Sequence, residues 1–296
     1  MRKIIVHLRG GLGNQMFQYS LGKVLAKDNN CELVLDNWSG FLRDQYRRKY
    51  ELHNFPIKAR LIKPLERFPI WIYRIKKRLL NQNENFHEKI LNNLIINETE
   101  NKFLSNILNM QIKRNTWLNG YWQSPLYFNH HEKILKTELR PPIPKSNKIL
   151  KLGEQMKNNN SVAIGIRLYE ESNDPASHAK NRKIKSPEEI NSVIERLKKK
   201  YQNAKFYLFC TNNSPFLKKL DLPENTISIF SNNEPKRHID KLWLLSQCRH
   251  HVFNNSTFYW WGAWLSSTNH KYSDQDIYAS DNFLNDNIIF NEWNKF

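Results

Sequence analysis

The sequence is poor in the residues that mark several large classes of protein. Its 296 residues include only 3 cysteines, Cys31, Cys210 and Cys248, which are odd in number and far apart. They form no C-x-x-C pair, so we expect free thiols in a reducing compartment. Only 9 glycines and a hydrophobic content of 40% exclude a collagen-like or disordered chain and indicate an ordinary globular protein.

Long apolar runs are also missing. No segment approaches the ~20 apolar residues of a membrane span. The apolar stretch after Met1 breaks at Arg9-Gly10-Gly11, too early for a signal peptide. We therefore expect a cytoplasmic protein. Histidine pairs occur at His130-His131 and His250-His251, but neighbours on a strand point to opposite faces, so the sequence predicts no metal site.

Positive charge, in contrast, is abundant. The formal net charge is +18, from 46 basic and 28 acidic residues, and a surface of that kind favours a polyanionic partner. Nucleic acid, anionic lipid and a phosphorylated substrate all qualify. Basic residues and aromatics interleave between Ile57 and Leu80, which indicates either a helix on a membrane surface or a solvated helix whose aromatics pack inward.

The N-terminus predicts a strand, a glycine loop and a helix. Residues 2–8 form a buried apolar run, the loop Arg9–Gln15 follows, and apolar residues then recur at helical spacing up to Leu25. Gly10, Gly11 and Gly13 would let backbone N–H groups approach a phosphate, and the side chains of Asn14 and Gln15 add donors. The loop matches neither G-x-G-x-x-G nor the Walker pattern, so a plain tight turn is the alternative.

The rest of the first half carries less chemistry. A second strand ends at Asp36, on the edge where parallel sheets form sites. Short helices are expected over 86–94 and 103–108, and a strand leads from Trp117 into a helix near Pro125. The proline-rich run 140–147 reads as a connector. We therefore divide the chain into domains 1–145 and 146–296.

The second half alternates strands and helices, which predicts a parallel, doubly wound sheet. Its strands are expected at 162–166, 205–210, 227–230 and 251–254, and its helices at 187–200, 215–220, 240–248 and 257–265. The strand ends carry one arginine and several hydroxyl and amide groups, which would meet at one sheet edge and form a nucleotide-diphosphate pocket. They are Arg167, Thr211-Asn212-Asn213, Ser231-Asn232-Asn233 and Asn255-Ser256-Thr257.

The last of these strand ends has two interpretations. Asn254 to Thr257 are helix-capping residue types ahead of the aromatic run Phe258 to Leu265. The cap could simply open a core helix. It could also offer a phosphate site, because free N–H groups and the helix dipole favour an anion there.

Three ordered motifs resemble one family, the bacterial α-1,2-fucosyltransferases of glycosyltransferase family 11. The first is Gly10-Gly11-Leu12-Gly13-Asn14-Gln15-Met16-Phe17-Gln18-Tyr19. The second is Gly120-Tyr121-Trp122-Gln123-Ser124 with Tyr127-Phe128. The third is Asn255-Ser256-Thr257-Phe258 with Trp260 to Leu265, preceded by a helix containing Asp240. The resemblance spans nearly the whole chain.

The resemblance implies a GT-B-like α/β fold, in which two Rossmann-type domains face a central cleft. It implies GDP-fucose as donor, no required metal, and inverting transfer of L-fucose to O2 of a terminal galactose. Gly11, Asn14 and Gln15 would face the donor, with Gly10 and Gly13 shaping their loop. Arg167, Ser256 and Thr257 would hold the diphosphate beside Asn255. Asp240, Thr211 and Asn212 would contact guanine or ribose.

One strand end departs from the family pattern. The family shows His-x-Arg-Arg-Gly-Asp where this chain has Gly165-Ile166-Arg167-Leu168-Tyr169-Glu170, so only the first arginine and an acid remain. Arg167 is expected to stabilise the leaving diphosphate. Glu170 and Glu171 are the first candidates for a base that deprotonates the acceptor, followed by Asp36.

The implied setting is surface-polysaccharide synthesis, such as that of O-antigen. The acceptor would be a galactose-terminated glycan, in a lipid-linked form at the inner face of the cytoplasmic membrane, where the basic segment would contact anionic lipid. We expect no nucleic acid partner. Two alternatives stay open: the same fold with another GDP-sugar or acceptor, and a non-catalytic basic protein that binds RNA or lipid.

Overall fold

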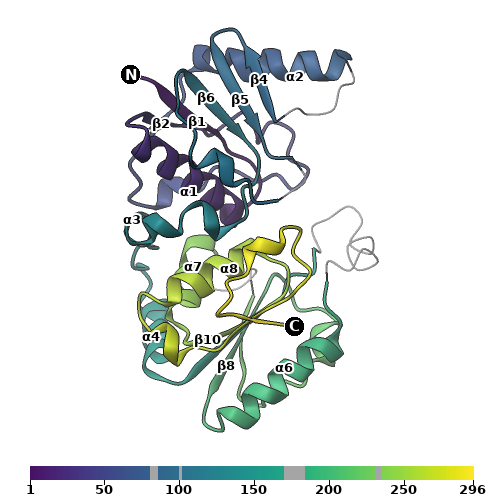
Figure 1. Ribbon diagram of the computed structural model, residues 1–296. Helices are drawn as coiled ribbons and strands as arrows, with labels where there is room; N and C mark the ends of the chain where they lie inside the picture. Colours follow the sequence, from purple (N-terminus) through teal and green to yellow (C-terminus); the bar gives the residue numbers. More distant parts are fainter. Residues whose placement is uncertain (81–85, 100–101, 170–183, 231–234) are drawn as a thin grey trace. The chain divides into compact units, whose positions relative to one another are not determined.

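The computed structural model describes all residues except 81–85, 100–101, 170–183 and 231–234 (Figure 1). The chain forms two compact units. The first comprises Met1–Leu139 together with Asn285–Ile288, and the second comprises Arg140–Leu284 together with Ile289–Phe296. The division in the chain thus falls at the start of the predicted connector, and the first unit also takes in a short C-terminal segment that the sequence did not indicate.

The first unit is built on a six-stranded sheet, counted over the described residues, with the order β3-β2-β1-β6-β5-β4. All neighbouring strands are parallel except β4, which is antiparallel to β5. The strands are β1 Lys3–His7, β2 Glu32–Asp36, β3 Arg60–Leu61, β4 His87–Ile90, β5 Asn93–Asn97 and β6 Asn115–Asn119.

Two long helices cover opposite faces of this sheet. They are α1 (Leu12–Asp28) and α2 (Phe68–Leu80). Ile70 and Tyr73 of α2 pack with Ile5 of β1, whereas Gly22 of α1 lies against Val6, where an added Cβ would meet a methyl carbon at 2.3 Å. Because adjacent strand residues point to opposite faces, the unit has three layers.

The remaining helices of the first unit are short. They are α3 (Glu132–Glu138) and the 3-10 turns η1 Leu52–Asn54, η2 Pro64–Arg67, η3 Ser105–Ile107, η4 Pro125–Tyr127, η5 Asn129–His131 and η8 Asp286–Ile288.

The second unit contains another six-stranded sheet across the residues described, of order β12-β11-β10-β7-β8-β9, and every neighbouring pair in it is parallel. The strands are β7 Ser161–Gly165, β8 Lys205–Cys210, β9 Ile227–Phe230, β10 His250–Phe253, β11 Ile277–Ala279 and β12 Asn294–Lys295. The helices and turns are α4 Asn147–Asn158, α6 Pro187–Lys200, η6 Leu217–Lys219, α7 His238–Gln247, α8 Thr257–Ser266 and η7 Tyr272–Asp274.

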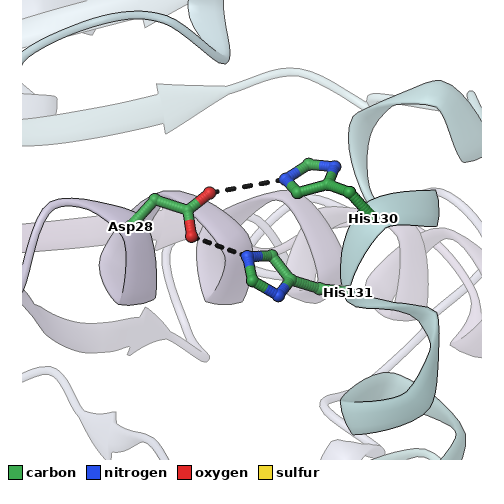
Figure 2. A group of neighbouring side chains, drawn as sticks. All are labelled: Asp28, His130 and His131. Atoms are coloured by element: carbon green, nitrogen blue, oxygen red, sulfur yellow. Dashed lines mark hydrogen bonds and ion pairs between the residues drawn. The ribbon is translucent and has the colours of Figure 1, made fainter.

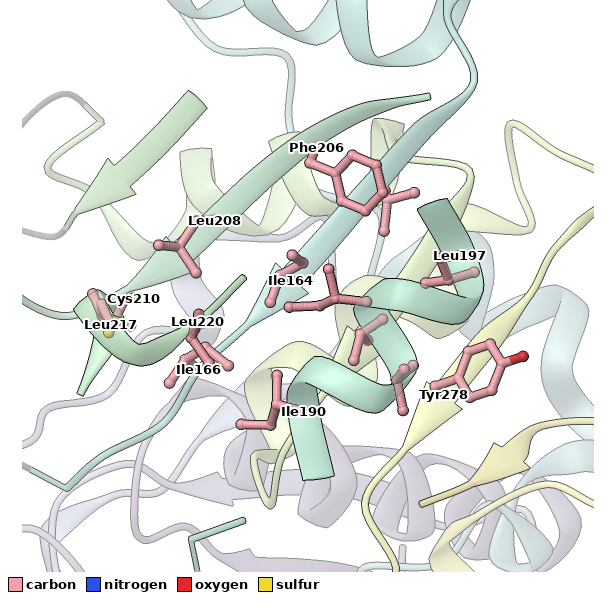
Figure 3. Close-up of a cluster of buried hydrophobic side chains, with 14 of the residues drawn as sticks. Ile164, Ile166, Ile190, Leu197, Phe206, Leu208, Cys210, Leu217, Leu220 and Tyr278 are labelled. Atoms are coloured by element: carbon pink, nitrogen blue, oxygen red, sulfur yellow. The ribbon is translucent and has the colours of Figure 1, made fainter. Parts of the chain in front are cut away.

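Helix α6 covers one face of this second sheet. Its Ile190 and Leu197 pack against Ile164 of β7 and Leu208 of β8 in the main apolar cluster of the unit (Figure 3). On the other face, the ring of Tyr259 in α8 packs directly against Gly165 of β7. A Cβ added to Gly165 would lie 2.5 Å from the nearest atom of that ring. The buried tryptophans of α8, Trp260, Trp261 and Trp264, fill the core as expected.

Several local predictions were wrong. The predicted helix over 86–94 is the hairpin β4–β5, which turns at Leu91 with a φ of 53°. The predicted helices over 103–108 and 215–220 are reduced to the single 3-10 turns η3 and η6. β11 and β12 had not been predicted. The hairpin was missed because its short alternating run lies in an asparagine-rich segment without a clear period.

All three cysteines are free. Among the helices that the structure describes, none combines the length and the apolar character needed to cross a bilayer.

Candidate active site

The glycine loop joins β1 to α1 at the carboxyl edge of the first sheet. Gly10 has a φ of +77°, and a Cβ there would lie 2.6 Å from Nδ2 of Asn14, so the position requires glycine. Gly11 is the N-cap of α1, and an added Cβ would find its nearest neighbour, Nε of Arg48, at 3.7 Å. Gly13 is buried in the first turn. The loop therefore has room for a ligand beside Gly11.

Gln15 holds the glycine loop from inside the unit. Its side chain is fully buried. Nε2 donates to the carbonyls of Gly10 (3.0 Å) and Lys49 (2.8 Å), and Oε1 accepts from the backbone N–H of Glu51 (2.9 Å). The prediction that Gln15 faces the donor is therefore corrected: its polar atoms position the backbone that would do so.

Gln18, one turn later in α1, also holds the backbone of the loop, and the sequence analysis did not predict this role. Oε1 of Gln18 accepts from the N–H of Arg9 (3.0 Å), and Nε2 donates to the carbonyl of Arg9 (3.2 Å). Gln18 is fully buried. The two glutamines thus hold the backbone of Arg9 and Gly10, at the start of the loop.

The second family motif, Gly120–Ser124 with Tyr127-Phe128, is called the middle motif below, and it meets this loop at the same sheet edge. Nε2 of Gln123 donates to Oδ1 of Asn14 (2.9 Å). The carboxylate of Glu98, just after β5, accepts from the backbone N–H groups of Tyr121 (2.5 Å) and Trp122 (2.9 Å). Trp122 has a φ of 55°, a costly conformation for a bulky residue. Glu98 stabilises that turn, and no local pattern in the sequence indicates the contact.

Charge and an aromatic ring also lie at this edge. The guanidinium of Arg9 stands 4.5 Å from the ring centroid of Tyr121. Burial raises the pKa of Glu98, although hydrogen bonds from Tyr121 and Trp122 and the charge of Arg9 oppose the shift. The ends of β1, β6 and β5 are adjacent in the sheet, so Arg9, the glycine loop, Tyr121 and Glu98 form one group.

Asp36, the third candidate base, is committed to a buried network. Its Oδ2 accepts from Nδ1 of His7 (3.2 Å), and Oδ1 accepts from the N–H of Ser39 (3.1 Å). Nε2 of His7 lies 2.5 Å from Nη2 of Arg74. A guanidinium only donates, so this Nε2 accepts and the His7 proton sits on Nδ1. With both residues fully buried, Asp36 cannot reach an acceptor hydroxyl.

In the second unit, Arg167 follows β7 at the carboxyl edge, as predicted, and its backbone is clamped. Oδ1 of the fully buried Asn254 accepts from the N–H of Arg167 (2.7 Å), and Nδ2 donates to its carbonyl (2.7 Å). The half-buried guanidinium lies 4.6 Å from the ring centroid of Tyr169. The sequence analysis treated Asn254 as a capping residue type and missed its role as the partner that positions Arg167.

Neighbouring groups hold the same strand end. The hydroxyl of Tyr169, at a φ of 58°, donates to the carbonyl of Asn255 (3.1 Å). The hydroxyl of Tyr259 lies within hydrogen-bond distance of the carbonyls of Ile166 (3.2 Å) and Phe209 (3.0 Å). Nδ2 of Asn255 donates to the carbonyl of Asn282 (2.9 Å), so Asn255 orders the loop with its side chain.

Helix α8 begins beside Arg167, since β10 and β7 are neighbours. Ser256 is its N-cap residue, but within the described part of the chain its side chain makes no capping hydrogen bond. The expectation of a side-chain cap was therefore wrong at this position. Thr257 is the first residue of α8 and is half-buried. This N-terminus keeps the positive end of a helix dipole next to Arg167, an arrangement that suits a phosphate.

Thr211, Asn212 and Asp240 were predicted to contact guanine or ribose. Thr211 and Asn212 are half-buried directly after β8. Asp240, in the first turn of α7, is gripped by Arg237, with Nε at 2.8 Å from Oδ2 and Nη2 at 2.6 Å from Oδ1. A nucleoside that hydrogen-bonds Asp240 would therefore displace Arg237.

Lys241, next to Asp240, was missed by the sequence analysis. It is buried, and burial lowers its pKa to about 8, opposed by the neighbouring Cys210. Cys210 is the last residue of β8. Lys241 thus places a second cation near the carboxyl edge of this sheet.

Some predicted site residues lie outside the described residues. These are Glu170 and Glu171, the first candidates for the base, and Ser231-Asn232-Asn233 after β9.

Two groups contain residue types that can bind a metal ion. An Asp-x-Asp sequence, Asp274-Gln275-Asp276, precedes β11 at the amino edge of the second sheet, and Oδ2 of Asp276 pairs with Lys200 (2.7 Å). The reasoning that His130 and His131 diverge was wrong, because they lie on the 3-10 turn η5 and both approach Asp28 (Figure 2).

Comparison with known proteins establishes the family and the fold of the chain. The family model for glycosyl transferase family 11 matches residues 2–296. The chain belongs to this family. The predicted fold class, a GT-B-like α/β fold with two Rossmann-type domains, is confirmed by the two parallel sheets and by the similar structures described next. As a family 11 glycosyltransferase, the protein is an enzyme rather than a non-catalytic binding module.

Curated relatives are similar along most of the chain. An alpha-1,2-colitosyltransferase of Escherichia coli is 28% identical over 284 residues, which cover 90% of this chain and 89% of the relative. The O-antigen biosynthesis glycosyltransferase WbnK of Escherichia coli is 27% identical over 282 residues, covering 89% of this chain and 90% of the relative.

Solved structures share the fold at low sequence identity. Fucosyltransferase NodZ from Bradyrhizobium has a TM-score of 0.52 at 14% identity, covering 88% of this chain and 91% of its own. A mutant of Arabidopsis thaliana FUT1 in complex with GDP has a TM-score of 0.50 at 10% identity, covering 94% of this chain and 70% of its own.

Proposed function

We propose that this family 11 enzyme transfers L-fucose from GDP-fucose to O2 of a terminal galactose, with inversion and without a required metal. The observation that carries the proposal is the strand end at Arg167. There Asn254 clamps the backbone of an arginine next to the N-terminus of α8. Both features supply fixed positive potential where a departing GDP gains negative charge.

The described residues also divide the remaining tasks. The loop at Gly10, Gly11 and Gly13, held by Gln15, offers backbone N–H groups to the donor, with Asn14 beside it. Thr211, Asn212 and Asp240 are candidates for the nucleoside. Glu170 or Glu171 remains the candidate base, because Asp36 is sealed in its network with His7. A dissociative transition state needs little help from a base.

A second donor is favoured by one specific observation, the similarity to a colitosyltransferase. Colitose lacks the 3-hydroxyl of fucose. A site built to hydrogen-bond that hydroxyl rejects the deoxy sugar by about 10⁴-fold or more, whereas a merely apolar pocket tolerates the added hydroxyl within about 10²-fold. The ratio of the two donors is therefore informative about the site itself.

A donor panel tests the proposal. The purified protein is incubated with GDP-fucose, GDP-colitose or GDP-mannose and a β-galactoside, and kcat/KM is measured from GDP release. We expect GDP-fucose to give the highest value and NMR of the product to show an α-1,2 linkage. A higher kcat/KM with GDP-colitose would identify GDP-colitose as the preferred donor. Absence of turnover with all three donors would refute the proposal.

The similarity to an O-antigen enzyme supports an acceptor glycan of surface-polysaccharide synthesis. If that glycan is lipid-linked, the enzyme must approach the inner face of the cytoplasmic membrane. Helix α2 has a suitable surface: Ile75 and Leu79 are 60% and 77% exposed, and Lys76 and Arg78 are exposed beside them. Apolar and basic groups together favour an anionic bilayer.

Vesicle flotation tests this membrane contact. With anionic phosphatidylglycerol vesicles we expect the protein to float, and the double variant Ile75→Asp/Leu79→Asp to stay in solution. Ile143→Asp, at a residue that is 74% exposed in the second unit, is the matched control and should float like the native protein. Equal flotation of all three would assign any binding to charge elsewhere.

A further inference from the structure

We propose that Asp28, His130 and His131 form a binding site for a divalent transition-metal ion, of which zinc is the best candidate. The bound ion would link the end of α1 to the segment after β6. Asp28 is the last residue of α1, and the two histidines are on η5. They are more than a hundred residues from Asp28 in the chain. The site is separate from the sheet edges that carry the candidate active site.

The geometry brings three ligand atoms to one point. Nε2 of His131 lies 2.6 Å from Oδ1 of Asp28, and Nε2 of His130 lies 3.4 Å from Oδ2. Figure 2 shows both rings turned toward the carboxylate. The three ligand atoms all lie within 4.8 Å of one another. A tetrahedral zinc ion with bonds of about 2.0–2.1 Å separates its ligands by about 3.3 Å, so small rotations of the three side chains suffice.

The chemistry of the donor set selects the ion. Two imidazole nitrogens and one carboxylate oxygen are ligands that zinc accepts, and water can complete the fourth position. A calcium or magnesium ion would require oxygen ligands instead. In the hydrogen bonds now present, Nε2 of each histidine carries the proton. Binding moves that proton to Nδ1 or to solvent, because the ion takes the Nε2 lone pair.

The location also favours a cation. Asp28 stands at the C-terminus of α1, where the helix dipole disfavours a carboxylate and favours positive charge.

The bound metal ion would add to a series of contacts between α1 and the segment 123–138. Asn14 at the first turn bonds Gln123, and Tyr19 and Lys23 in the middle bond Glu138. The cluster around Asp28 is the last link of this series and the one most exposed to solvent. A metal there would hold the helix that presents the glycine loop against the middle motif.

Zinc titration of the full chain, freed of metal with EDTA, tests the site. By isothermal titration calorimetry the native protein should bind one more equivalent of ZnCl₂ than His130→Ala/His131→Ala. Its Tm should rise by about 5 °C or more at a hundredfold excess over Kd. His53→Ala, which removes an exposed histidine of the same unit, is the control and should keep the extra equivalent.

Two further measurements distinguish the loss of a metal site from misfolding of the double variant. Asp28→Asn keeps both histidines and the side-chain volume, and should also lose the extra equivalent. Cobalt(II) added to the native protein should give the visible d–d absorption of a tetrahedral site, and this absorption should be missing from Asp28→Asn. Equal zinc stoichiometry in the native protein and the variants would overturn the proposal, leaving a cluster joined by hydrogen bonds only.

Discussion

The two units present the same kind of sheet edge to a ligand but stabilise it in different ways. In the first unit, buried glutamine side chains hold a backbone loop whose own N–H groups are the proposed ligand contacts. In the second, a buried asparagine holds the backbone of Arg167, whose charged side chain is the proposed ligand contact. Both use a side-chain amide as a clamp, because an amide can donate to a carbonyl and accept from an N–H at once.

This comparison teaches which residues each edge can lose. Where the functional group is backbone, a change must disturb the loop to matter. Where it is a side chain, truncation removes the function and leaves the fold. Four experiments test the residues at the two edges.

The largest effect is expected for Arg167→Ala. Loss of the group that offsets charge on the departing diphosphate should reduce kcat by about 10²–10³-fold or more. The melting temperature should stay close to that of the native protein, because the guanidinium is only half-buried. Arg167→Lys is the control and should recover part of the rate, since it restores charge without the fork. Near-normal turnover of the alanine variant would refute the assignment.

Lys241→Met tests the buried cation of the second unit through pH. Burial lowers the pKa of Lys241 to about 8, whereas a lysine in the unfolded chain titrates near ~10.4. Below pH 8 both states carry the proton and the folded state bears the whole cost, about 3 kcal/mol. The cost disappears as the pH rises from about 8 to ~10.4, where only the unfolded state still holds the proton.

The methionine variant should therefore be more stable than the native protein at pH 7, with the difference shrinking by pH 10. Urea unfolding at both pH values measures this. A difference that does not depend on pH would mean that Lys241 is protonated in the folded state throughout.

The clamps themselves can be compared through Gln15→Ala and Asn254→Ala. Each leaves buried backbone groups without a partner and should lower the free energy of unfolding by about 1–3 kcal/mol. Their kinetics should differ. Asn254→Ala should lower kcat, because Arg167 loses its position, whereas Gln15→Ala should mainly raise the KM for the donor. An unchanged kcat in Asn254→Ala would separate the clamp from the chemistry.

The smallest effects are expected in the glycine loop. Gly10→Ala forces an L-residue into a φ of +77° against Asn14 and should cost about 1–2 kcal/mol. Gly11→Ala meets no close atom and should leave the stability unchanged. If a donor phosphate approaches the loop, Gly11→Ala should still raise the KM for the donor. An unchanged KM would place the donor elsewhere.

Much of the fold was predictable because its signals are local. The strands β1, β2, β7, β8, β9 and β10 contain short apolar runs, and the helices α1, α6, α7 and α8 show helical repeats or long apolar stretches. The hairpin β4–β5 was not predictable, because its alternating pattern is short and depends on pairing with β6. The second sheet also includes strands β11 and β12, which come from a C-terminal region with little periodicity.

The candidate site shows the same limit. From strand ends and from the family motifs, the sequence predicted that Arg167 and the glycine loop would contact a ligand, and this stays a prediction. It missed Asn254, Gln18 and Glu98 as supports, since each bonds to backbone groups that the sequence does not mark. It also placed His130 and His131 on opposite faces, because it assumed a strand where the chain forms a 3-10 turn.

The sequence alone determined the family, the βα order and the list of polar groups at strand ends, because motif spacing and apolar periodicity are properties of neighbouring residues. Only the tertiary structure decided which of those groups are buried supports and which are exposed. Gln15 and Asn14 are adjacent in one motif, yet the side chain of Gln15 is turned fully inward while that of Asn14 meets Gln123. Burial and hydrogen-bond partners depend on distant segments, such as that of Gln123, which lies 109 residues from Asn14 in the chain, and only the folded chain brings these segments together.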